Sequence, residues 1–142
     1  MPSSVVFFRA MLIASVVLSL LSSFVDVFVP NLIPEQLVTA FKELPSTATP
    51  ALMAAGALFV ITFGGTIVAI IGLFSFQPWS RNLAVSMTLL TLLAYPLLGV
   101  TIASGWAQLF SNLSTLLWGV VLAMSYFSSL AARFVASPTA PR

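Results

Sequence analysis

The sequence predicts an all-α integral membrane protein: a four-helix bundle with a short amphipathic helix at the membrane surface between its first and second spans. Of its 142 residues, 60% are hydrophobic and 6% are charged, whereas soluble domains carry about 25% charged residues. Four apolar runs are each long enough to cross about 30 Å of hydrocarbon. The length suits a single membrane domain, residues 1–142.

The first span is expected over residues 5–29. We expect it to be retained rather than cleaved as a signal peptide, because no small-x-small cleavage site follows the apolar run. Arg9 lies one turn inside its start, where a long side chain can reach the headgroups. Asp26 lies one turn before its end and can reach the opposite interface.

Residues 30–50 form the expected outer loop. Pro34 and Glu35 are typical of a helix start, since proline suits the first turn and a carboxylate is favoured near the positive end of the helix dipole. Apolar residues then recur at helical spacing, at Leu37, Phe41 and Leu44. This pattern predicts a short amphipathic helix on the membrane surface.

The second span is expected over residues 51–74, with Thr49 as the N-cap and Pro50 as the first helical residue. Small residues lie on one face of this span, at i, i+4 and i+7, and such a face lets another helix approach closely. They are Gly65, Ala69 and Gly72.

A polar turn over residues 76–82 (FQPWSRN) precedes the third span. Pro78 suits the first position of the next helix, and Arg81 is the expected topological anchor. The third span is expected over residues 83–103, with a kink at Tyr95 and Pro96 because proline removes a backbone donor.

The fourth span is expected over residues 109–132. Trp118 falls near its middle and is expected to pack against other helices. Arg133 ends the span, and residues 135–142 are expected to form a disordered tail.

The distribution of basic residues predicts the orientation. One side receives Arg9, Arg81, Arg133 and Arg142, whereas the other receives only Lys42, in a loop that also holds Glu35 and Glu43. The excess of Lys and Arg on cytoplasmic loops therefore predicts cytoplasmic N- and C-termini. These residues are scattered singly along the chain, so no patch for nucleic acid is expected.

Hydroxyl-bearing residues recur on one face of each span. In the first span the face carries Ser15, Ser19, Ser22 and Asp26; in the third it carries Thr88, Thr91 and Tyr95. Thr62 and Thr66 lie beside the glycine face of the second span, and Ser111, Thr115, Trp118, Ser125 and Ser129 share a face in the fourth.

Two interpretations of these faces stay open. The hydroxyls can bond carbonyls of their own or a neighbouring helix inside the bundle. Alternatively, they form a polar path for an ion or small solute that ends at Asp26. Arg81 and Arg133 likewise serve either as plain anchors or as ligands of anionic headgroups.

The inventory of reactive side chains is small. There is no Cys and no His, and the carboxylates are Asp26, Glu35 and Glu43. Thiol and imidazole chemistry are therefore excluded, and we expect no catalytic site, no metal site and no cofactor.

Three local features carry a resemblance: residues 28–34 (FVPNLIP), the turn 76–81 (FQPWSR) and residues 126–130 (YFSSL). With them the chain resembles small uncharacterised bacterial inner-membrane proteins with four spans. The resemblance implies four helices in a bacterial inner (cell) membrane and no particular activity. The chain departs from small multidrug exporters, which need a glutamate in the first span, and from fluoride channels, whose third-span pattern Thr88 and Thr91 do not reproduce.

The small-residue faces and the lack of catalytic groups predict a non-enzymatic accessory or self-associating helical module. Its expected partners are the lipid bilayer and a second copy or another membrane protein. The alternative is an oligomeric channel or passive transporter for an ion or small solute, built around the Ser and Thr faces.

Overall fold

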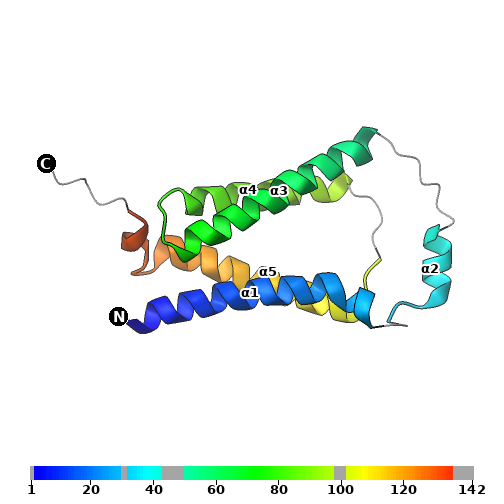
Figure 1. The fold of residues 1–142 in the computed structure, drawn as a ribbon, viewed down its shortest axis with the longest axis horizontal. Helices are drawn as coiled ribbons and strands as arrows, with labels where there is room; N and C mark the ends of the chain where they lie inside the picture. Colours follow the sequence, from blue (N-terminus) through cyan, green and yellow to red (C-terminus); the bar gives the residue numbers. More distant parts are fainter. Residues whose placement is uncertain (1, 30–31, 43–49, 98–101, 136–142) are drawn as a thin grey trace, which may run out of the picture.

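The computed structural model describes residues 2–29, 32–42, 50–97 and 102–135. Within these residues every regular element is a helix, and the prediction of an all-α protein is confirmed (Figure 1). The elements are α1 (Pro2–Phe28), α2 (Glu35–Lys42), α3 (Pro50–Phe74), α4 (Ser80–Ala94), η1 (Tyr95–Leu97), α5 (Gly105–Phe127) and η2 (Ala131–Phe134).

Three helices of the described chain are long and apolar enough to cross a membrane. They cover Ser4–Phe28, Met53–Phe74 and Gly105–Phe127. The structure is thus compatible with the expected membrane protein. The helix α4 is shorter, with 15 residues.

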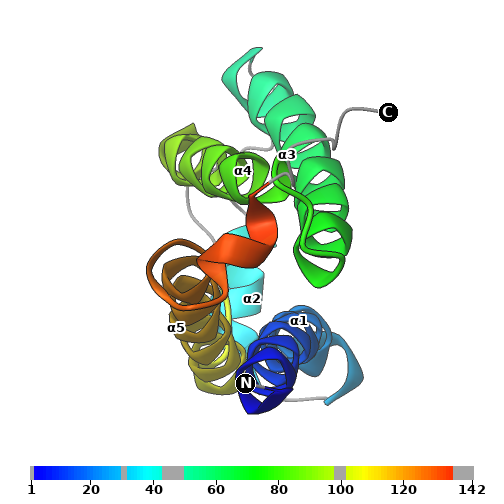
Figure 2. The same ribbon diagram turned by 90° about the vertical axis from the view of Figure 1, so that its left-hand side faces the viewer.

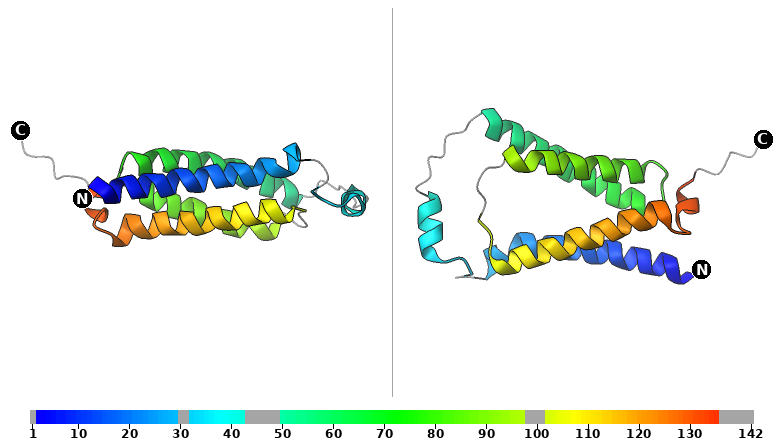
Figure 3. Two further views of the ribbon diagram at one scale, coloured as in Figure 1. Left: turned by 90° about the horizontal axis from the view of Figure 1, so that it is seen from below. Right: turned by 180° about the vertical axis from the view of Figure 1, so that it is seen from behind.

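The long helices form two antiparallel pairs. The helix α1 packs along α5 and α3 packs along α4, with fewer contacts between the pairs. The pairs converge at the end that holds the N-terminus and η2, and they splay apart at the end that holds α2 (Figure 3). Seen along its length, the molecule has η2 lying across the converging end (Figure 2).

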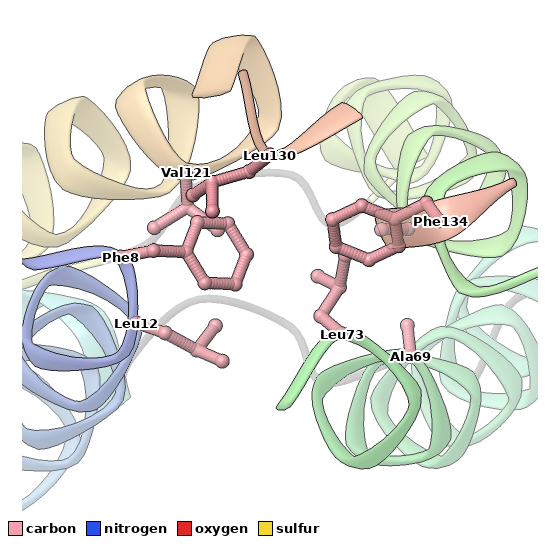
Figure 4. Packing of buried hydrophobic residues seen from close by; sticks show 8 residues of the cluster. Phe8, Leu12, Ala69, Leu73, Val121, Leu130 and Phe134 are labelled. Carbon is pink, nitrogen blue, oxygen red and sulfur yellow. The ribbon is translucent and has the colours of Figure 1, made fainter. Parts of the chain in front are cut away.

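A buried apolar core joins the two pairs at the converging end. Phe8 and Leu12 of α1 meet Leu73 of α3 and Phe134 of η2 (Figure 4). The rings of Phe8, Phe76 and Phe134 lie with centroids 5.1 to 6.1 Å apart, within the range of favourable aromatic contacts. This end of the molecule is therefore closed by packed side chains.

Small residues let α3 and α4 approach each other. A Cβ atom added at Gly65 would lie 2.2 Å from Met87 Sδ, and one added at Gly72 would lie 2.6 Å from Ser80 Cβ. Ala69 is fully buried. The predicted small-residue face therefore packs against α4 of the same chain.

The turn between α3 and α4 is a Schellman motif. The Gln77 N–H donates to Gly72 O at 2.9 Å, and the Phe76 N–H donates to Leu73 O at 3.2 Å. Phe76 takes the left-handed conformation, with φ 55°, which an L side chain rarely adopts. Its ring packs into the aromatic cluster, which offsets the backbone strain.

The predicted helix start at Pro78 is wrong. The helix α4 begins at Ser80, and Pro78 lies in the turn rather than at the first helical position. Ser80 Oγ donates to Gln77 O at 2.7 Å. This hydrogen bond closes the turn against the start of the helix.

The predicted kinked helix over residues 83–103 is also wrong. The α-helix ends at Ala94, Tyr95–Leu97 forms a 3₁₀ turn, and residues 102–104 are not helical. Pro96 explains the end, because it has no N–H to donate to the carbonyl of Leu92 and its ring crowds the preceding turn.

The fourth helix is shifted toward the N-terminus from the predicted residues 109–132. It begins at Gly105 because Ser104 is its N-cap, with Oγ accepting from the Ala107 N–H at 3.1 Å. It ends at Phe127, and the Leu130 N–H donates to Ser128 Oγ where the chain turns into η2.

The other expected boundaries lie close to the observed ones. The helix α1 ends at Phe28, α3 begins at Pro50, and α2 begins directly after Pro34. The predicted N-cap Thr49 and most of the predicted tail, residues 136–142, lie outside the described residues.

Candidate functional site

A groove separates the two helix pairs away from the core. Its volume is about 450 Å³, with α1 and α5 on one side and α3 and α4 on the other. Five residues of the predicted polar path line it: Ser15, Ser19, Thr88, Thr91 and Tyr95. Thr62 and Thr66 of the second span line it as well. The structure therefore brings together hydroxyl faces that lie far apart in the sequence.

The two remaining residues of the predicted path are not among the described residues that line the groove. Ser22 Oγ donates to Ala107 O at 2.8 Å. Asp26 Oδ2 accepts from the Ser104 N–H at 3.0 Å, at the start of α5, where the helix dipole favours a carboxylate. Both side chains thus form hydrogen bonds that join the end of α1 to the start of α5.

Most hydroxyl groups that line the groove already donate a hydrogen bond. Six hydroxyls donate to backbone carbonyls at 2.8 to 3.1 Å, those of Ser15, Thr62, Thr88, Thr91, Ser114 and Thr115. Five of these bonds stay within one helix; Ser114 donates across to Ser15 O of α1.

Within the described chain, the hydroxyls of Ser19, Thr66 and Tyr95 make no hydrogen bond. Apolar side chains such as Phe59, Phe63 and Ile67 fill the rest of the lining. The surface of the groove is therefore mostly carbon, in spite of its many Ser and Thr residues.

Trp118 marks the boundary between the groove and the core. It lines the groove and packs against the core cluster, and its indole Nε1–H donates to Thr88 Oγ1 at 2.9 Å. This bond ties α5 to α4 and thus links the two helix pairs. Beyond it, the core closes the groove toward the termini.

The three predicted anchors, Arg9, Arg81 and Arg133, lie at the converging end. Arg9 Nη2 donates to Phe74 O at 3.3 Å, at the end of α3. Arg81 Nη1 donates to Ser125 O at 3.2 Å, in the last turn of α5. Because the last carbonyls of a helix lack intrahelical partners, these cations suit both the hydrogen bonds and the helix dipole.

Sequence reasoning did not anticipate several of these contacts. The N-cap at Ser104 was detectable, since a serine before an apolar run is a helix-start signal. The Trp118 to Thr88 bond and the contact of Phe8 with Phe134 carry no local signal, because they depend on how the helices are arranged.

Comparison of the chain with protein-family models, with curated proteins and with solved structures gives no match. The described part of the chain is helical, with three helices long and apolar enough to span a membrane.

Proposed function

We propose that the chain crosses the membrane four times and acts by binding rather than by catalysis, holding one acyl chain of a lipid in the groove between its helix pairs. The helix path supports the fourth crossing. The helix α3 ends at the converging end and α5 begins at the splayed end (Figure 1), so the chain has to return between them. The 15 residues of α4 rise about 22 Å along that return.

The charges support the predicted orientation. Arg9, Arg81 and Arg133 lie at the converging end, whereas Asp26 and Glu35 lie toward the splayed end. An excess of arginine marks the cytoplasmic side. The converging end, which holds the start of α1 and η2, then faces the cytoplasm of a bacterial cell, and α2 lies on the outer surface of the inner membrane. Glu35 in its first turn and Lys42 in its last suit the helix dipole.

The size of the groove carries the proposal. Small-molecule sites have volumes of about 300 to 1,000 Å³, and the groove has about 450 Å³. A partner helix about 10 Å wide would need roughly 1,700 Å³ along a length of about 22 Å. The groove therefore fits a flexible chain but not a further helix.

The chemistry of the lining favours an apolar occupant. A path for ions needs oxygens and N–H groups that replace the hydration shell. Here six hydroxyl groups of the lining donate their protons to backbone carbonyls and cannot also donate to an anion, and none of the described lining residues is charged. The core of Phe8, Leu12, Leu73 and Phe134 closes the groove at one end. Both features favour a lipid chain over the alternative of a channel.

Self-association through the small-residue face is less well supported, because Gly65 and Gly72 are covered by α4 of the same chain. A role as an accessory module stays part of the proposal, with the bilayer as the first partner. A second copy or another membrane protein would have to use the outward faces.

Quenching of Trp118 by brominated lipid tests the proposal. A double variant, Trp79→Phe with Trp106→Phe, leaves Trp118 as the single tryptophan. This protein is placed in phosphatidylcholine vesicles with or without bromine on the acyl chains. We expect brominated chains to quench Trp118 strongly. Adding Thr66→Phe, which fills the groove, should remove about half of that quenching, since the new ring occupies space of the chain.

Val68→Phe is the matched control, since Val68 is 48% exposed and is not among the described residues that line the groove. It should leave the quenching unchanged. Weak quenching together with red-shifted, water-like emission of Trp118 would contradict the proposal. Ion flux through vesicles that carry the protein would instead support the channel.

A further inference from the structure

Three arginines gather around two aromatic rings at the converging end. The guanidinium carbons of Arg9 and Arg133 lie 5.6 and 5.8 Å from the centroid of the Phe76 ring. That of Arg81 lies 5.3 Å from the centroid of Phe134. The two rings are 5.1 Å apart. Each of the three guanidinium groups thus contacts one ring of the Phe76 and Phe134 pair.

The structure also shows what holds two of these cations. Arg9 lies over the Phe74 ring at 4.6 Å and donates one hydrogen bond to Phe74 O. Arg81 lies over the Tyr126 ring at 5.0 Å and donates one hydrogen bond to Ser125 O. Contacts with ring faces leave the edges of a guanidinium group, which carry its donors, available for other partners.

The positive charge at this end has no counter-charge in the described part of the chain. Asp26 and Glu35 lie toward the opposite end. A guanidinium group has five N–H donors. Arg9 and Arg81 each use one Nη atom for a backbone carbonyl, and their Nε atoms are buried without an acceptor among the described residues, so the remaining Nη donors are the ones that an anion can reach. An anion is therefore the group that completes the arrangement.

We propose that Arg9, Arg81 and Arg133 bind the phosphate group of an anionic lipid of the cytoplasmic leaflet. The planar fork of arginine matches phosphate oxygens in bidentate geometry. A terminal phosphate carries a charge of about −1.5 to −2 near pH 7, so a phosphomonoester headgroup suits three cations better than a phosphodiester does. The site requires the proposed membrane crossing, but it is separate from the groove.

Native mass spectrometry of the protein in neutral detergent tests the site with short-chain lipids. We expect phosphatidic acid to bind more tightly than phosphatidylglycerol, with phosphatidylcholine weakest. The key variant is Arg133→Gln, because the Arg133 side chain is exposed and its guanidinium group makes no hydrogen bond within the described chain. The Arg133→Gln substitution should weaken binding of phosphatidic acid about tenfold, as expected for the loss of one charge-assisted contact.

Two controls separate this result from a general effect of charge. Lys42→Gln removes a cation at the opposite end of the protein and should change the affinity by less than about twofold. Arg133→Lys keeps the charge but loses the fork and should fall between the wild type and Arg133→Gln. Equal losses for Arg133→Gln and Lys42→Gln would overturn the site.

Inorganic phosphate distinguishes the source of the phosphate group. We expect it to compete with phosphatidic acid only weakly, because it gains nothing from the surrounding apolar surface. Competition at the same concentration as the lipid would overturn the assignment to a lipid. Equal binding of phosphatidic acid and phosphatidylcholine would overturn the proposal as a whole. Quenching of Trp118 in Arg133→Gln should stay at the wild-type level, so the groove and the arginine site are tested separately.

Discussion

The packing of α3 against α4 is tested by adding a single methyl group at three glycines of the same helix. A Cβ at Gly72 would meet Ser80 Cβ at 2.6 Å and the Trp79 ring at 2.8 Å. Ser80 is fully buried, and a Cβ atom moves only with its backbone. A Cβ at Gly65 would meet Met87 Sδ at 2.2 Å. At Gly64 no atom of the described chain lies within 4 Å.

The expected free energies follow from two opposing terms. Overpacking a well-packed contact costs about 1 to 3 kcal/mol, whereas alanine in place of glycine favours a helix by up to about 1 kcal/mol. Gly72→Ala should therefore lower the free energy of unfolding by about 1 to 2 kcal/mol. Gly65→Ala should cost less, since the Met87 side chain can rotate away. Gly64→Ala should be neutral or stabilising.

Equilibrium unfolding in mixed micelles, with increasing sodium dodecyl sulfate and tryptophan fluorescence as the signal, measures these differences. A loss of about 1.4 kcal/mol corresponds to a tenfold change in the unfolding equilibrium, which such titrations resolve. Gly64→Ala serves as the matched control. If Gly64→Ala destabilises the protein as much as Gly72→Ala, the two helices do not pack as described.

Three further substitutions have expected outcomes. Asp26→Asn should lower the free energy of unfolding by about 1 kcal/mol, because the charge-assisted bond to the Ser104 N–H becomes a neutral one. The same titration with sodium dodecyl sulfate measures this loss, and a gain in stability would contradict the role of the carboxylate. Trp118→Phe and Thr88→Val should each cost about 0.6 kcal/mol, and since they share one hydrogen bond, the double variant should cost less than their sum. Pro96→Ala should extend α4 past Ala94, seen by NMR as α-helical contacts between residues i and i+4 across positions 92–97; their absence would show that something other than the proline ends the helix.

The ends of helices were largely predictable from the sequence, because they depend on local chemistry. Pro50 begins α3 and Pro34 precedes α2, as proline at a helix start implies. Pro96 indicated that the regular helix is interrupted, but its position alone did not distinguish a kink from a helix end. Phe76 was not predictable, since left-handed residues at this position are usually glycine or asparagine.

The pairing of helices was much less predictable. In lipid, the outward face of a helix is as apolar as its packed face, so the hydrophobic pattern does not mark the interface. The face of Gly65, Ala69 and Gly72 indicated a close approach but not that α4 makes it. The hydroxyl faces of Ser15 and Thr91 indicated a shared interior; that they line a groove depends on how the two pairs splay.

The two ends of the molecule are packed differently. At the converging end, aromatic rings and arginines hold both pairs together. Toward the splayed end, the pairs separate (Figure 3). The groove lies between them. Because fewer contacts join the two pairs than join the helices within each pair, the proposed acyl chain could enter the groove without breaking either pair.

The number of crossings is the claim on which the account depends most, and labelling of single cysteines measures it directly. The chain has no native Cys, so Gln36→Cys, Gln77→Cys, Ala103→Cys and Ala132→Cys each provide one exposed thiol. In intact cells, a membrane-impermeant maleimide should label positions 36 and 103 and should leave 77 and 132 unlabelled until the membrane is opened. Labelling of position 103 only after the membrane is opened, together with position 77, would mean that α4 does not cross and would contradict the four-crossing topology.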